Sequence, residues 1–204
     1  LCGRWGKPEK AIEAIDEAWS YDPPSPGPLH LRLARLHQRA GRFSAALEAM
    51  ERAIEARPDE LHYAVVKAWI LQEADRVDDA VETLAAAAEA HPDASVDLRV
   101  EKARLYAAAD RRGEASAVMA RLVEAHPDRA AELYYMQSLL PGGRADAKET
   151  ERLLLKSIEA DPDYAPANND LGYTWADAGR NLKRAESMIR KAVAASPDNA
   201  AYLD

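Results

Sequence analysis

Apolar residues in this chain recur three or four positions apart within short segments, which is the spacing of one face of an α-helix. Near the C-terminus, Leu171 and Trp175 mark one such segment, and Ala185, Ile189 and Ala192 mark the next. The pattern predicts a first helix over 7–20 and then pairs of helices over 27–40 and 44–56, 61–74 and 77–90, 94–109 and 112–125, 129–140 and 146–160, and 164–179 and 182–195. No segment shows the two-residue alternation of a strand, so the chain is predicted to be all-α.

Proline closes each of these pairs at a regular interval. The dipeptide Pro-Asp occurs at Pro58, Pro92, Pro127, Pro162 and Pro197, at spacings of 34 or 35 residues, and Pro23 has the same phase. Small residues stand 12 and 5 positions before these prolines on the second helices, and 24 or 25 positions before them on the first helices. On the second helices they are Ala11 and Ala18, Ala46 and Ala53, Ala80 and Ala87, and Ala185 and Ala192, and on the first helices they are Ala34, Ala68, Ala103 and Gly172.

This period and these small residues resemble the tetratricopeptide repeat family over essentially the whole chain. The resemblance implies a right-handed α-solenoid of helix-turn-helix repeats. The expected divisions are a partial repeat at 1–26, repeats at 27–60, 61–95 and 96–130, a degenerate repeat at 131–164, a repeat at 165–198, and the start of another at 199–204. Because both ends fall inside repeats, we expect the chain to be a fragment of a longer array.

Two units depart from the pattern. Leu122 replaces the second small residue of the third full repeat, although Ala115 keeps the first. In the fourth, Thr150 and Ser157 occupy both small positions, and a Pro-Gly-Gly sequence interrupts the end of the first helix. We expect looser or locally rearranged packing in these units.

Composition excludes several classes of function. The formal net charge of −8 argues against a generic nucleic-acid surface, which needs clustered Lys and Arg. No apolar run reaches the length of about eighteen residues that a membrane span needs. Cys2 is the only cysteine, so no intrachain disulfide can form, and no signal peptide is visible. We expect a soluble chain without membrane insertion, in the cytoplasm or the periplasm.

No catalytic constellation is apparent, and we expect no enzyme activity, cofactor or metal. The histidines are His30, His37, His62, His91 and His126. His91 and His126 share one repeat phase, which favours charge placement at helix C-termini over a metal site. The aspartates after the prolines are interpreted as residues that cap or charge the next helix, namely Asp59, Asp93, Asp128, Asp163 and Asp198. The sequence Gly142-Gly143-Arg144 lacks the pattern of a phosphate-binding loop.

The resemblance further implies that the first helix of each repeat lines a concave groove where peptides or partner helices dock. The groove positions of the family correspond here to Leu31, Arg35, Gln38, His62, Val65, Trp69, Gln72, Val100, Arg104, Tyr135, Leu139, Asn169 and Tyr173. Their Trp, Tyr and Arg content is typical of interface hot spots. The alternative for Trp69 and the tyrosines is packing between helices, and Trp175 takes the position of the family's packing aromatic.

The sequence therefore predicts a non-enzymatic scaffold that binds a peptide or protein partner, and the last repeat resembles bacterial members of the family. Two alternatives stay open. In the first alternative the chain is a regulatory or substrate-recruiting domain of a larger enzyme. In the second it is a self-assembly module. The second alternative rests on the apolar face of the helix over 182–195, which would favour end-to-end association if it were uncovered.

Overall fold

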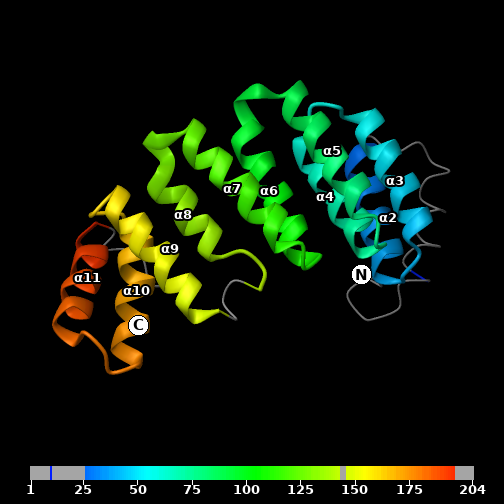
Figure 1. The fold of residues 1–204 in the computed structure, drawn as a ribbon. Coiled ribbons are helices and arrows are strands. Elements are labelled where there is room, and N and C mark those ends of the chain that lie inside the picture. The colour runs from blue at the N-terminus through cyan, green and yellow to red at the C-terminus, as the bar shows by residue number, and fades with distance from the viewer. Residues whose placement is uncertain (1–9, 11–25, 143–145, 196–204) are drawn as a thin grey trace. The chain divides into compact units, whose positions relative to one another are not determined.

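The computed structural model describes Lys10, residues 26–142 and residues 146–195. These contain ten α-helices (Figure 1): α2 (Pro26–Arg39), α3 (Phe43–Ala56), α4 (Leu61–Glu73), α5 (Val77–Ala90), α6 (Ser95–Ala108), α7 (Arg112–Ala125), α8 (Ala130–Ser138), α9 (Ala147–Ala160), α10 (Ala165–Asp177) and α11 (Leu182–Ala195). Short 3-10 helices, η2 (Pro92–Ala94) and η3 (Pro127–Arg129), precede α6 and α8. The described residues include no strand, which confirms the all-α prediction for them.

Each of these helices begins and ends within two residues of its predicted bounds. The predicted helix over 7–20 lies outside the described residues apart from Lys10. The chain divides into two compact units, Leu1–Leu105 and Tyr106–Asp204. In the first unit α2 packs on α3, α3 on α4, and α4 on α5; in the second unit α7, α8, α9, α10 and α11 pack successively on one another. Packing of each helix on its neighbour in sequence is the arrangement of an α-solenoid.

Small residues lie where the paired helices approach most closely. The predicted positions that are almost completely buried, with at most 1% of their surface exposed, are Ala34, Ala46, Ala53, Ala68, Ala80, Ala103, Ala185 and Ala192. A Cβ atom placed on Gly172 would lie 2.9 Å from Cγ1 of Ile189 and 3.0 Å from the carbonyl oxygen of Ala185. The backbones of α10 and α11 are therefore in near contact. Ala87 departs from the prediction, since it is half-buried and its neighbour Ala88 is the buried residue. Ala11 and Ala18 lie outside the described residues.

The fourth repeat is locally rearranged, as expected. Helix α8 has only nine residues. Ser157, at one of the small-residue positions, and Ser138 at the end of α8 are buried. Both donate hydrogen bonds at 2.6 Å to backbone carbonyl oxygens, Ser157 to Ala131 and Ser138 to Tyr135. These bonds satisfy hydroxyl groups that would otherwise be buried at a cost. In the third repeat, Leu122 is accommodated in the core with 2% exposure, so the expected looser packing is absent at this side chain.

Of the two roles interpreted for these aspartates, the charge role is supported at Asp93 and Asp128, and no side-chain capping bond is made at the described positions. Asp59 and Asp163 lie one residue before the N-cap positions of α4 and α10, and neither of those positions makes a side-chain capping bond. Asp93 and Asp128 lie in the first turns of η2 and η3, where a negative charge is favourable near the helix N-terminus. A capping bond occurs instead at Asp146, whose side chain accepts from two amides at the start of α9. Asp198 lies outside the described residues.

Four of the turns that join paired helices contain a residue in the left-handed conformation, namely Gly41, Asp75, Asp110 and Gly179, with φ between 59° and 69°. In each turn the next residue is an arginine whose backbone amide donates to the carbonyl five positions earlier, at 2.8–2.9 Å. This is the Schellman arrangement, which satisfies carbonyl groups at the end of a helix. Aspartate therefore occupies two turns at a backbone conformation that favours glycine.

We expect Asp75→Gly to raise the free energy of unfolding by about 0.5–1 kcal/mol, because glycine avoids the steric cost of a side chain at positive φ. Urea denaturation followed by circular dichroism measures this change. The reciprocal control is Gly41→Asp, where a new Cβ has no neighbour within 4 Å, so that only the backbone cost is added. It should lower the free energy of unfolding by a similar amount. A less stable Asp75→Gly variant would contradict the prediction.

Candidate functional site

The predicted groove residues all lie on or at the end of the first helices of the pairs. Leu31, Arg35 and Gln38 lie on α2; His62, Val65, Trp69 and Gln72 on α4; Val100 and Arg104 on α6; Tyr135 on α8, with Leu139 at its C-cap; and Asn169 and Tyr173 on α10. The groove residues of the two compact units are taken one unit at a time.

In the first unit the polar groove residues Arg35 and His62 are exposed, Arg104 is half-buried, and all three interact with their neighbours. Nη2 of Arg35 on α2 lies 3.0 Å from Nε2 of His62 on α4, so these two predicted residues are brought together. Arg104 donates to the carboxylate of Glu101 at 3.0 Å. The first contact joins adjacent first helices and the second lies within α6, and neither forms an enclosed site.

The apolar groove residues of the first unit contribute mainly to packing. Leu31, Val65 and Trp69 are partly buried and pack against the apolar core of this unit. Val100 retains only 3% exposure. Part of the Trp69 side chain therefore packs between helices, as the alternative to a groove contact expected. Val100 has almost no exposed surface for a partner.

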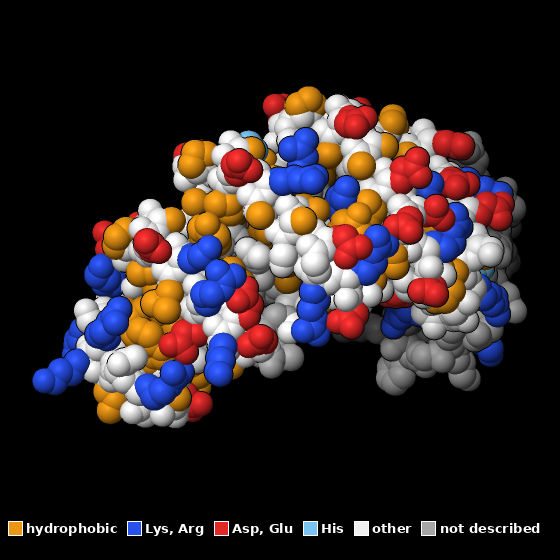
Figure 2. All heavy atoms as spheres, in the orientation of Figure 1, with side chains coloured by type: hydrophobic (Ala, Val, Ile, Leu, Met, Phe, Trp, Pro, Cys, Tyr) orange, Lys and Arg blue, Asp and Glu red, His pale blue; other side chains and the backbone are white. Residues whose placement is uncertain are grey.

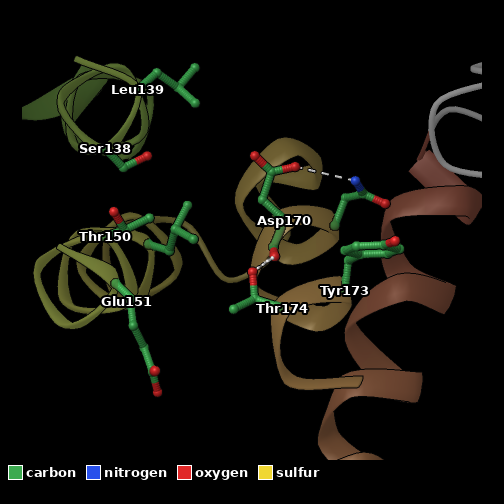
Figure 3. A pocket seen from close by; sticks show the side chains of 10 residues that line it. Ser138, Leu139, Thr150, Glu151, Asp170, Tyr173 and Thr174 are labelled. Atoms are coloured by element: carbon green, nitrogen blue, oxygen red, sulfur yellow. Dashed lines mark hydrogen bonds between the residues drawn. The ribbon is translucent and has the colours of Figure 1, made fainter. Parts of the chain in front are cut away.

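The second unit contains a pocket with a volume of about 480 Å³ between α8, α9 and α10 (Figure 3). It is lined by Ser138, Leu139, Ala147, Thr150, Glu151, Leu154, Asn169, Asp170, Tyr173 and Thr174. Leu139, Asn169 and Tyr173, which were predicted from the sequence, meet here. Tyr135 lies next to them, since its hydroxyl donates to Asp170 at 3.3 Å and its ring meets that of Tyr164 edge-on at 5.8 Å.

Sequence reasoning missed the wall that α9 contributes. The family positions carried over from the resemblance lie on first helices, whereas Thr150, Glu151 and Leu154 lie on a second helix. A signal was present, because Thr150 is one of the two residues that break the small-residue pattern in this repeat. Asp170 and Thr174 were also missed, although they neighbour predicted positions on α10.

The carboxylate of Glu151 accepts hydrogen bonds from two side chains near the C-terminal end of α10. Nε1 of Trp175 donates to one oxygen at 2.9 Å, and Arg180 donates to the other at 2.9 Å. These two bonds, that from Trp175 first, lower the pKa of Glu151 below its ordinary value. Trp175 is 2% exposed in the apolar core of the second unit, which confirms the interpretation of this residue as a packing aromatic. Figure 3 shows Glu151 directed away from Asp170.

Surface charge is mixed. On the face drawn in Figure 2, Lys and Arg side chains of the described residues alternate with Asp and Glu, and hydrophobic side chains are exposed between them. That face carries no extended basic patch of the kind that binds phosphate groups, as far as its described residues show.

The histidines do not form a site in the described part of the chain. His91 and His126 occupy the C-cap positions of α5 and α7, as their repeat phase predicts. Among residues 26–142 and 146–195 no group of three His, Cys, Asp or Glu side chains could hold a metal ion. The same segments include no helix with the length and apolar character needed to cross a bilayer.

His30 differs from the other histidines because it is buried, with 5% exposure. Burial lowers its pKa, the charge of Arg52 lowers it further, and Glu55 opposes these effects. The folded pKa lies below the unfolded value of about 6.5, so protonation favours the unfolded chain. The contribution of neutral His30 to the free energy of unfolding is fully present above the unfolded pKa and is lost as the pH falls through the folded pKa.

We expect the free energy of unfolding to fall between pH 7.5 and pH 5.5, and His30→Leu to reduce this fall, because leucine cannot be protonated. Urea titrations at the two pH values measure the effect. Gln38→Leu, on the same helix and without a titratable group, is the control and should retain the pH dependence of the wild type. An equal pH dependence in His30→Leu and wild type would contradict the prediction.

Comparisons with known proteins agree with this architecture. Residues 6–70 and 71–140 each match a family model described as "Tetratricopeptide repeat". The chain is similar to the solved structure of TTC0263, a TPR protein of Thermus thermophilus, with 20% identity and a TM-score of 0.50 over 87% of this chain and 95% of that chain. It is also similar to MamA from Desulfovibrio magneticus RS-1, with 15% identity and a TM-score of 0.46 over 86% and 98% of the two chains.

A third similar structure is YrrB, described as a TPR protein with an unusual peptide-binding site, with 18% identity and a TM-score of 0.44 over 94% of this chain and 97% of that chain. At these identities the likeness concerns the fold alone. The search among curated proteins gave no significant match.

Proposed function

Because the chain belongs to the tetratricopeptide repeat family, we propose that it is a non-enzymatic scaffold that binds a peptide or protein partner on the face formed by the first helices of its repeats. In this proposal the main contact is the pocket between α8, α9 and α10, and the exposed residues Arg35 and His62 on α2 and α4 add a second contact surface.

The observation that supports the proposal is the convergence of three of the predicted groove residues on one pocket. Leu139, Asn169 and Tyr173 come from two different first helices and line the same cavity. Tyr173 is 63% exposed, so its ring is available for contact with a partner. Apolar walls with a few convergent polar groups are typical of ligand pockets, and Tyr is enriched in interface hot spots.

The test uses a random twelve-residue peptide library selected against the full chain, followed by titration calorimetry of the enriched peptides. We expect Tyr173→Ala to weaken their binding at least tenfold, since removal of a hot-spot aromatic costs about 2 kcal/mol or more. The control is Leu182→Ala, because Leu182 is also 58% exposed but lies on α11 and does not line the pocket.

Two further variants, Trp69→Ala and Arg104→Ala, test the contribution of the first unit. Thermal unfolding of each variant shows whether a loss of binding comes from a loss of fold. Failure to select any peptide, or equal affinities for the wild type and all of the groove variants, would contradict the proposed function.

A further inference from the structure

The two carboxylates that line the pocket differ in how their charge is compensated. Glu151 has a cationic partner in Arg180. Asp170 accepts from the hydroxyl of Tyr135 and from the side-chain amide of Asn169, each at 3.3 Å. Both donors to Asp170 are neutral, and in the described part of the chain no Lys, Arg or His forms an ion pair with it. Asp170 is half-buried, so water also screens it incompletely.

The carboxylate of Asp170 can accept further hydrogen bonds in addition to these two. A carboxylate offers about four acceptor positions. Tyr135 uses one on Oδ2 and Asn169 uses one on Oδ1, so each oxygen of Asp170 retains a position. A planar guanidinium donates two parallel N–H groups to the two oxygens of one carboxylate, whereas an ammonium acts as a single point of charge. The open positions therefore match arginine better than lysine.

The surroundings of Asp170 suit the rest of an arginine side chain. Leu139 and Leu154 supply apolar surface from α8 and α9, against which a methylene stem can pack. Figure 3 shows Leu139 on the opposite side of the pocket from α10. Tyr173 lies three residues after Asp170 on one face of α10, and its exposed ring can contact a guanidinium bound at the carboxylate.

We propose that this pocket receives an arginine side chain from an extended segment of the partner protein, with its guanidinium on Asp170 and its stem between Leu139 and Leu154. The proposal rests on the proposed function and adds the chemistry of the ligand. Charge complementarity supports it, since a cation fills the need of an uncompensated carboxylate in a chain of net charge −8.

The direct probe is Nα-acetyl-arginine methylamide, titrated into the full chain and followed by two-dimensional amide NMR. We expect shifts at residues 169–174 of α10 and at Thr150 of α9. The citrulline analogue has the same shape without the charge and should bind at least tenfold more weakly, and the lysine analogue should also bind more weakly than arginine. Asp170→Asn should weaken arginine binding about tenfold, the effect of one lost charge-assisted contact.

Asp177→Asn is the matched control, because Asp177 is an exposed aspartate at the end of the same helix and does not line the pocket. It should leave arginine binding unchanged. Equal binding of arginine and citrulline, no shifts at α10, or an unaltered affinity in a folded Asp170→Asn variant would overturn the inference. If library selection yields tight peptides without arginine whose binding Tyr173→Ala still weakens, the arginine assignment fails while the proposed function stands. If no peptide is selected, the proposed function itself fails.

Discussion

Ala185→Leu is expected to lower the free energy of unfolding by about 1–3 kcal/mol, which is the usual cost of forcing extra methylene groups into a packed core. Ala185 is 1% exposed on α11, and its carbonyl oxygen lies only 3.0 Å from the position of a Cβ atom on Gly172 of α10. The extra carbons of leucine have no space between two backbones at this distance. The helices must therefore separate, or the leucine must adopt a strained rotamer.

Urea denaturation followed at 222 nm measures this change. Ala194→Leu introduces the same atoms at a more exposed position of the same helix and should change the free energy of unfolding by no more than about 0.5 kcal/mol. Hydrogen exchange should locate the loss in α10 and α11, because in a repeat array each element is stabilised mainly by its neighbours. An unchanged melting temperature for Ala185→Leu would show that these alanines do not set the helix spacing.

The helices and the buried small residues could be predicted because both follow from a period. A repeat places Ala34, Ala68 and Ala103 at equivalent points, so one geometric argument covers all three, and each is completely buried. The core position of Trp175 follows in the same way. His91 is another example, since its phase before the proline places it at the C-cap of α5.

What the period could not provide is the set of contacts that differ between repeats. The hydrogen bond from Ser157 to the carbonyl of Ala131 joins α9 to α8, and it exists because this repeat replaces an alanine by a hydroxyl-bearing residue. Thr150 likewise stands at a point where this repeat differs from the others. A single helical pattern indicates which way a side chain faces, but not which side chain of another helix it meets. The pocket wall on α9 therefore became visible only in three dimensions.

Trp175→Ala is expected to cost about 3–5 kcal/mol, the usual range for removing a buried aromatic side chain. Trp175 is 2% exposed and packs in the core of the second unit, where its ring also lies 5.0 Å from the guanidinium carbon of Arg184. The substitution leaves a cavity and removes the N–H that holds Glu151. The pKa of Glu151 should then rise toward its ordinary value, because its largest cause of lowering is lost.

Trp175→Phe separates these two effects, since it retains most of the packing and removes only the N–H donor to Glu151. Trp175→Phe should lower the free energy of unfolding by at most about 1.5–3 kcal/mol, which is the contribution of a hydrogen bond to a charged group. Arg180 still compensates the carboxylate and limits the loss. Because the folded pKa of Glu151 is lowered, its ionised carboxylate stabilises the fold at pH values above the unfolded pKa, and this stabilisation is lost as the pH falls through the folded pKa. Both variants lack part of this stabilisation, so they should lose less stability than the wild type when the pH is lowered below about 4.5. A Trp175→Ala variant as stable as Trp175→Phe would show that the donor at Glu151, and not the ring in the core, is what stabilises this end of the chain.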